Sequence, residues 1–210
     1  MQGDETRRVI EQHVSGLGPA LYAGIAYGVQ DAFTRAQGLK HAKYPHLRPL
    51  ITRASLREYL ETEGLPDPWS VTGNPALMGQ LLITSAPMNL TLRVLKERRR
   101  SYPQSIPVAG HNKARRKAWQ APLFDISPSS PNSTELLLLW DYAEQADEGF
   151  TLRVVHPVEP GVYGQAVRCD LDFTVKPGGT LFENRQFTGD EEDIDFFQAH
   201  IERAENYDIN

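Results

Sequence analysis

Cysteine is almost absent from this sequence, which has 210 residues and a single cysteine, Cys169. One cysteine cannot form a disulfide within the chain, and this favours a reducing compartment, so we expect a cytoplasmic protein. A chain of this length buries roughly 70% of the surface that its unfolded form exposes, so a hydrophobic core suffices without disulfides. Cys169 lies on the apolar side of an alternating segment, which predicts a buried and unreactive thiol.

Long hydrophobic runs are also missing. The longest purely apolar run is Leu136 to Trp140, far short of the ~20 residues that span a bilayer. Residues 1–8 are polar, and no apolar core of a signal peptide follows them. We therefore expect no contact with a membrane.

The motifs of common catalytic and cofactor sites are absent from the sequence. It contains no His-Glu-x-x-His, no cysteine pair, no Gly-x-Ser-x-Gly, and no phosphate-binding or dinucleotide-binding loop. The six histidines are scattered and lack the spacing of zinc ligands. His156 alternates with apolar residues, which predicts a core histidine with a hydrogen-bond partner. We expect no cofactor, no bound metal and no catalytic residue.

One set of carboxylates keeps an enzymatic alternative open. Asp170 and Asp172 share a face of an alternating segment beside Arg168, and Asp141 ends another apolar run. Nucleases hold a divalent metal with acidic residues on neighbouring strands, and these three carboxylates would be the ligands of such an enzyme. A solvent-facing strand ordinarily carries residues of this kind, so the pattern favours binding over catalysis.

Residues 1–66 have the sequence pattern of helices. Residues 6–14 carry apolar side chains on one side, and Pro19 precedes a second run in which apolar residues recur every four positions. Gly24 and Gly28 lie close to the apolar face of that run. Two interpretations stay open: the glycines let another backbone approach closely, or they only weaken the helix.

A loop is predicted for residues 39–49, with a third helix after it. Ser55 and Glu58 have the spacing of a capping box, in which each side chain bonds the other residue's backbone N–H at a helix start. We therefore expect the third helix to begin at Ser55. Gly64 and Pro66 follow in the order that ends a helix.

Residues 68–182 have the pattern of a sheet. The run 136–142 is continuous and apolar, which is typical of a central strand buried on both faces. Alternating or β-rich runs predict further strands and two hairpins. The runs are 79–84 with 90–95, 136–142 with 150–158, and then 167–175. Because strands follow one another without alternating helices, we predict an α+β fold with a predominantly antiparallel sheet of about five strands.

The remaining residues are expected to belong to the same single domain, 1–210. A helix is predicted over residues 188–206, with an apolar inner face and an acidic outer face. The serine- and proline-rich stretch 127–133 is interpreted as a surface loop within this domain.

Charge is distributed unevenly along the chain. The segment Arg93–Lys117 contains nine cationic side chains and one carboxylate, a net charge of +8, so the rest of a chain whose total is −5 carries −13. Such asymmetry favours an anionic partner. Within the basic insertion 93–120, a short helix is predicted near residues 110–120, with Ala114, Ala118 and Trp119 toward the core.

Nucleic acid is the partner that this composition suits best. The paired N–H groups of an arginine guanidinium match phosphate oxygens. An asparagine can contact a base or the nucleic-acid backbone, and an aromatic ring can stack on a base. The predicted nucleic-acid-binding residues are Arg98, Arg99, Arg100, Asn112, Lys113, Arg115, Arg116, Lys117 and Trp119. The sequence does not distinguish DNA from RNA.

Another interpretation of the same charges is an interaction between proteins. The acidic C-terminal segment would pair with the basic helix or with a basic partner, as in antitoxin-like or phage accessory proteins. The Gly24/Gly28 helix and unpaired strand edges would also suit a homodimer. We therefore predict a non-enzymatic binding or regulatory protein, with a protein–protein module and a metal-dependent nuclease as alternatives.

Overall fold

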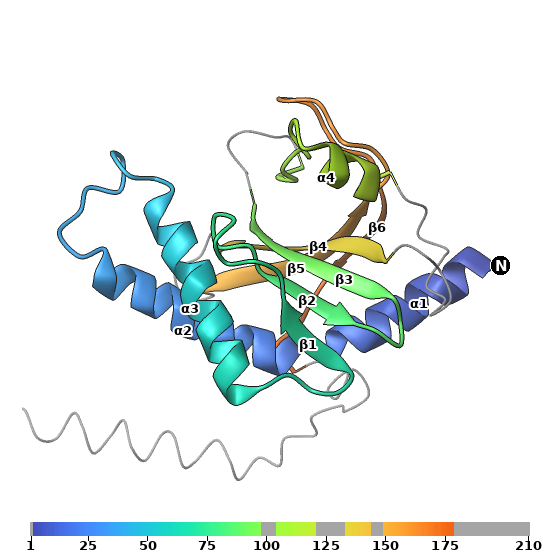
Figure 1. The fold of residues 1–210 in the computed structure, drawn as a ribbon, viewed down its shortest axis with the longest axis horizontal. Coiled ribbons are helices and arrows are strands. Elements are labelled where there is room, and N and C mark those ends of the chain that lie inside the picture. Colours follow the sequence, from blue (N-terminus) through green and yellow to red (C-terminus); the bar gives the residue numbers. More distant parts are fainter. Residues whose placement is uncertain (1, 98–103, 121–132, 144–148, 179–210) are drawn as a thin grey trace, which may run out of the picture. The chain divides into compact units, whose positions relative to one another are not determined.

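The computed structural model describes residues 2–97, 104–120, 133–143 and 149–178. Its centre is a six-stranded sheet in the order β1-β2-β3-β4-β5-β6 (Figure 1). The helices are α1 (Gln2–Ser15), α2 (Gly18–Arg35), α3 (Leu47–Glu63) and α4 (Lys113–Ala118). The strands are β1 (Trp69–Thr72), β2 (Leu82–Ser85), β3 (Leu90–Lys96), β4 (Thr134–Tyr142), β5 (Phe150–Pro157) and β6 (Cys169–Thr174).

The α+β class and the mostly antiparallel sheet are confirmed. Every neighbouring pair of strands is antiparallel except β3 and β4, which run parallel from the pair Leu90–Thr134 to the pair Lys96–Trp140. The sequence predicted about five strands, and the strand that it missed is β1, which has only four residues. The predicted terminal helix 188–206 lies outside the described residues. Among the described helices, none is both long and apolar enough to cross a membrane.

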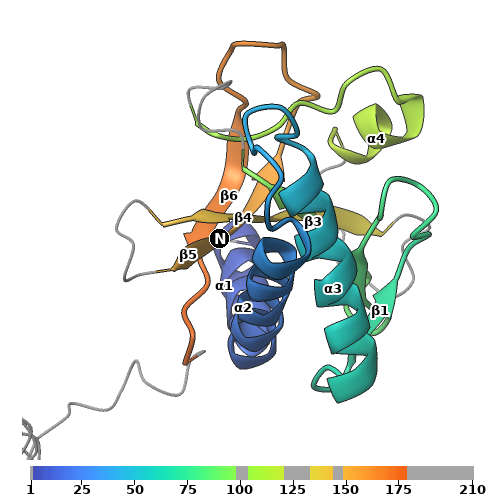
Figure 2. The ribbon, with the colours of Figure 1, turned by 90° about the vertical axis from the view of Figure 1, so that its left-hand side faces the viewer.

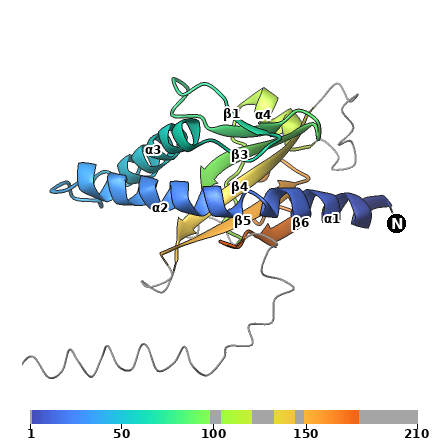
Figure 3. The same ribbon diagram turned by 90° about the horizontal axis from the view of Figure 1, so that it is seen from below.

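One face of the sheet is covered by α1, α2 and α3 (Figure 3). The core between these layers joins Ile10, Leu21 and Ile25 of the helices to Leu92 and Leu138 of the sheet, all of them fully buried. This core follows from the four-residue apolar spacing of α2 and the two-residue alternation of β3. The prediction of helices in the first third of the chain is therefore confirmed.

The opposite face of the sheet carries α4 and two loops (Figure 2). Here Leu137 and Leu139 of β4 pack with Trp119, next to α4, and with Val167, which precedes β6. Six consecutive residues of β4 are buried, because its odd and even positions serve the two different cores. The prediction that this run is a central strand buried on both faces is confirmed.

The third helix begins eight residues earlier than predicted, at Leu47. Pro49 stands in its first turn, where a backbone N–H has no helical partner, so proline does not interrupt it. Ser55 therefore lies inside α3, and its hydroxyl donates a hydrogen bond to the carboxylate of Asp31 on α2. The capping-box interpretation was wrong because the same spacing serves a contact between helices.

Close packing of α2 against α3 explains the two glycines of α2. A Cβ on Gly28 would lie 2.6 Å from the backbone oxygen of Thr52, and one on Gly24 would lie 2.6 Å from a methyl carbon of Leu56. The backbone that approaches α2 is thus that of α3 in the same chain. Of the two open interpretations, close approach is the one that the structure supports.

Gly28→Ala is expected to lower the free energy of unfolding by about 1–3 kcal/mol, because the new methyl group meets backbone that cannot move independently. Gly24→Ala is the matched control, since the nearest atoms there are ends of side chains that can rotate away. Urea denaturation of both variants would test this. A Gly28 variant as stable as the Gly24 variant would contradict the packing.

Candidate nucleic-acid interface

The basic helix α4 is short and has a defined start. Asn112 precedes it in an extended conformation, and its side-chain oxygen accepts a hydrogen bond from the backbone N–H of Arg115 at 3.0 Å. This is the standard chemistry of an N-cap. Asn112 was predicted to contact nucleic acid. Its side-chain oxygen is occupied by the cap, and the residue as a whole is exposed.

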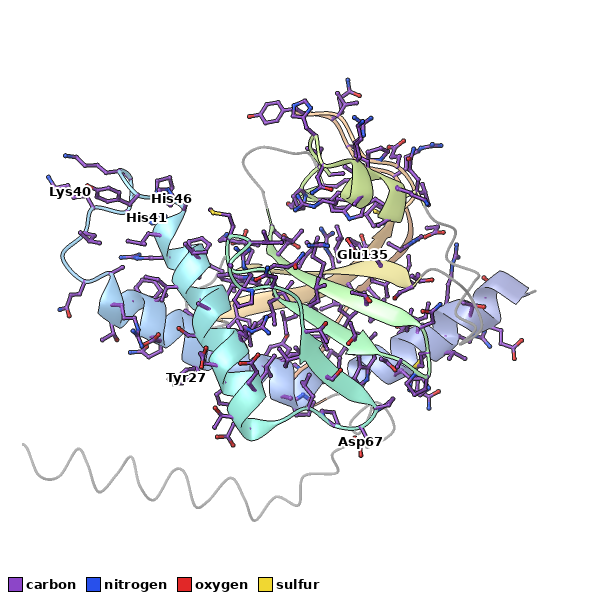
Figure 4. The ribbon with its side chains drawn as sticks, viewed as in Figure 1. Tyr27, Lys40, His41, His46, Asp67 and Glu135 are labelled. Carbon is purple, nitrogen blue, oxygen red and sulfur yellow. The ribbon has the colours of Figure 1, made fainter. Side chains whose placement is uncertain are left out.

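Trp119 fixes the other end of α4 to the sheet. Its side chain is fully buried in the second core, and its indole Nε1 donates to Glu135 Oε1 on β4 at 3.0 Å. Glu135 lies below α4 in Figure 4. A ring in this position offers no face to a base, so the expectation that Trp119 stacks on nucleic acid is wrong for this structure. Its role is to seat the helix.

The side of α4 that packs against the second core also differs from the predicted side. Ala118 packs against the second core, whereas Ala114 is exposed and Arg115 is partly buried in its place. Burial and the nearby charge of Arg93 lower the pKa of the Arg115 guanidinium, and the charge of Glu135 opposes them. Arg115 Nε has no hydrogen-bond partner within the described residues.

Beneath α4, Arg93 and Glu135 form a bidentate pair between the parallel strands β3 and β4. The two nitrogen–oxygen distances are 2.8 and 2.9 Å, and each side chain is 12% exposed. Glu135 thus accepts hydrogen bonds from Arg93 and Trp119 and lies near Arg115. One carboxylate faces two arginines here, so the region beneath α4 keeps a net positive charge.

The outward side of α4 presents three cations. Lys113, Arg116 and Lys117 are all exposed. Within the described ranges, none of them forms an ion pair with a carboxylate. Exposed cations on a short, fixed helix form a surface of the kind that meets phosphates. The predicted residues Arg98, Arg99 and Arg100 lie outside the described residues.

Another arginine, on β5, contacts residues that flank the stretch 98–103. Arg153 of β5 lies 3.2 Å from Glu97 Oε1 and 3.3 Å from Asp172 Oδ2, and it donates to the backbone oxygen of Gln104 at 2.9 Å. Glu97 and Gln104 are the described residues on either side of 98–103. Arg153 therefore holds both flanks of that stretch against the sheet.

The three carboxylates of the nuclease alternative are engaged separately. Asp141 contacts the ammonium of Lys96, and Asp170 lies 2.6 Å from Nδ1 of the buried His156. Asp172 contacts Arg153, as described above. Within the described part of the chain, no group of three histidine, cysteine or acidic side chains could hold a metal ion. The shared face of Asp170 and Asp172 does not become a joint ligand set.

The prediction for His156 is confirmed, whereas Cys169, which was predicted to be buried, is only partly buried. His156 is fully buried and has Asp170 as its hydrogen-bond partner. Cys169 packs against the second core, where burial raises the pKa of its thiol to about 12. The thiol is therefore protonated at neutral pH, which is the unreactive form.

A second cationic region was not predicted from the sequence. Residues 32–57 contain six lysines and arginines and no carboxylate, and they form the end of α2, the connection to α3 and most of α3. The charge pattern carried this signal, but its cations are spaced singly rather than clustered. Arg53 and Arg57 are partly buried and donate to backbone oxygens of the segment 72–80. The others lie toward the α2–α3 connection.

Comparisons with known proteins give no relative on which to rest a function. No family model, no curated protein and no solved structure matches the chain. The site must therefore be interpreted from its own chemistry.

Proposed function

We propose that this protein binds nucleic acid without catalysis, through the solvent-facing cations of α4. The observation that carries the proposal is the exposure of Lys113, Arg116 and Lys117 without carboxylate partners in the described part of the chain. A polyanion would supply the missing countercharge, and the release of its bound counterions would drive binding.

The seating of α4 supports the same proposal. The buried indole of Trp119 and the N-cap at Asn112 hold the helix in one position, so its cations are arranged before a partner arrives. A fixed arrangement reduces the conformational entropy that is lost on binding. The net charge of −5 argues against a protein that coats a polyanion with its whole surface, so contact is confined to its cationic regions. A role in regulating a nucleic-acid transaction, in the cytoplasm, fits a binding protein of this kind.

Fluorescence anisotropy with labelled duplex DNA, single-stranded DNA and RNA tests the proposal. The triple substitution Lys113/Arg116/Lys117→Ala is expected to weaken binding by roughly 10- to 100-fold at low salt. Arg116→Glu and Arg8→Glu form a matched pair: both residues are exposed arginines, and Arg8 lies on α1. Only the first change should weaken binding.

Three results would contradict the proposal. The first is no binding of any probe at low salt, which would favour a protein partner for the same cations. The second is equal weakening by Arg116→Glu and Arg8→Glu, which would mean that only total charge matters. The third is cleavage of the probe when Mg²⁺ is present, which would revive the nuclease alternative.

A further inference from the structure

Residues 33–48, at the end of α2, in the connection and at the start of α3, form the α2–α3 hairpin. This hairpin combines cations with exposed aromatic rings. Lys40, His41 and His46 lie at its tip in Figure 4. Phe33 and Tyr44 are 44% and 46% exposed, although large aromatic side chains are usually buried. Exposed aromatic rings among cations are a feature of surfaces that bind unpaired bases.

The base of this hairpin is an alternating row of cations and rings. The guanidinium of Arg48 lies 4.3 Å from the centre of the Phe33 ring, and that ring meets Tyr142 edge-on at 6.1 Å. The Lys96 ammonium then lies 5.1 Å from Tyr142 and 5.6 Å from Trp140. The cation–π contacts hold Phe33 with part of its surface facing solvent.

The charge of the hairpin is only partly neutralised. Arg35 pairs with Asp31 at 2.7 Å, and Lys96 pairs with Asp141. In contrast, Lys40, Lys43 and Arg48 form no ion pair with a carboxylate among the described residues. Positive charge therefore remains beside the exposed rings of Phe33 and Tyr44.

The hairpin and α4 project toward the same side of the molecule. Both lie at the top of Figure 1, and Figure 2, which keeps the vertical direction, shows them at the top again. A single strand that contacts the cations of α4 with its phosphates is thus the simplest partner for the hairpin as well.

We propose that the α2–α3 hairpin binds single-stranded nucleic acid by stacking unpaired bases on Phe33 and Tyr44. Lys40, Lys43 and Arg48 contact the phosphates on either side of the stacked bases. A duplex keeps its bases stacked on one another and offers the rings no face, so single strands are preferred. This inference rests on the proposed function and names its ligand more closely.

Three labelled probes of one length separate stacking from charge: a single-stranded oligonucleotide, the same strand with consecutive abasic sites, and the duplex. Tyr44→Ala is expected to weaken binding of the intact single strand by roughly 5- to 100-fold. Binding of the abasic strand should not change. Tyr27→Ala is the matched control, because Tyr27 is 51% exposed on α2 and contacts Tyr59, away from the tip (Figure 4).

Lys40→Glu/Lys43→Glu is a second variant, expected to weaken binding of both single strands. Thermal melting of each variant checks that the fold is intact. Equal affinity of the wild-type protein for intact and abasic strands would overturn the inference. An equal loss of affinity for the intact single strand in Tyr27→Ala and Tyr44→Ala would also overturn it. So would binding of anionic lipid vesicles that depends on Tyr44, together with no binding of nucleic acid.

The outcomes for the two surfaces can be told apart. If the α4 variant loses binding and Tyr44→Ala does not, the hairpin inference fails and the proposed function stands. If the hairpin variants lose binding and the α4 variant does not, the proposal for α4 fails and the hairpin inference stands.

Discussion

Replacing Trp119 by alanine is expected to lower the free energy of unfolding by about 3–5 kcal/mol, as for other fully buried large aromatic residues. The indole fills the second core between α4 and the sheet, where it touches no solvent. Its removal leaves a cavity beside Leu137 and Leu139 of the central strand, and it takes one hydrogen-bond donor from the partly buried carboxylate of Glu135. Urea denaturation measures the loss.

Trp119→Phe is the control that separates the loss of buried apolar volume from the loss of the hydrogen bond to Glu135. Phenylalanine keeps most of the buried apolar volume and loses only the bond to Glu135, so we expect a smaller loss, of about 1–3 kcal/mol. Equal stability of Trp119→Ala and the wild-type protein would contradict the second core. Binding of nucleic acid should also weaken in the alanine variant, because α4 is no longer fixed.

Glu135→Leu is expected to have a comparable effect, for an electrostatic reason. Arg93 would keep its partly buried position at 12% exposure without its bidentate partner. Removing one member of a buried ion pair typically costs about 3–5 kcal/mol, because the remaining charge is desolvated and uncompensated. Arg115 lies near the same carboxylate, so two cations would face one another across the site.

A double substitution separates the cost of leaving Arg93 unpaired from the other effects of removing Glu135. In Arg93→Met/Glu135→Leu both charges are absent, and apolar side chains of similar size replace them, so we expect a smaller loss of stability than in the single variant. Denaturation curves of the two variants measure the difference. A double variant that is less stable than Glu135→Leu would contradict the assignment of the cost to an unpaired arginine.

Strands with a strong hydrophobic pattern could be predicted from the sequence, and pairings that depend on distant residues could not. The continuous apolar run of β4 and its hairpin with β5 were predicted, because both signals are local. The parallel pairing of β3 with β4 joins residues about forty positions apart, and no local pattern encodes it. The start of α3 was misplaced, because Pro49 was taken as a loop residue when it occupies a first turn.

The candidate site was predicted as a segment but not as a surface. The charge excess located the basic helix, but the predicted docking side of Ala114, Ala118 and Trp119 was only partly right, because cations surround most of α4 and obscure its periodicity. The structure seats the helix through Trp119 and partly buries Arg115, and leaves Ala114 exposed. The α2–α3 hairpin was missed because its row of cations and rings joins Phe33 and Arg48 to Tyr142, which is remote in sequence.

The dependence of nucleic-acid affinity on salt is the most direct test of the central claim, that exposed cations of α4 contact phosphates. The logarithm of the binding constant should fall linearly with the logarithm of salt concentration, with about 0.7–0.9 of slope for each phosphate contact. Loss of three contacts in Lys113/Arg116/Lys117→Ala should therefore reduce the slope by about 2–3 relative to the wild-type protein. An unchanged slope in a folded variant would contradict the claim and show that α4 does not contact the phosphates.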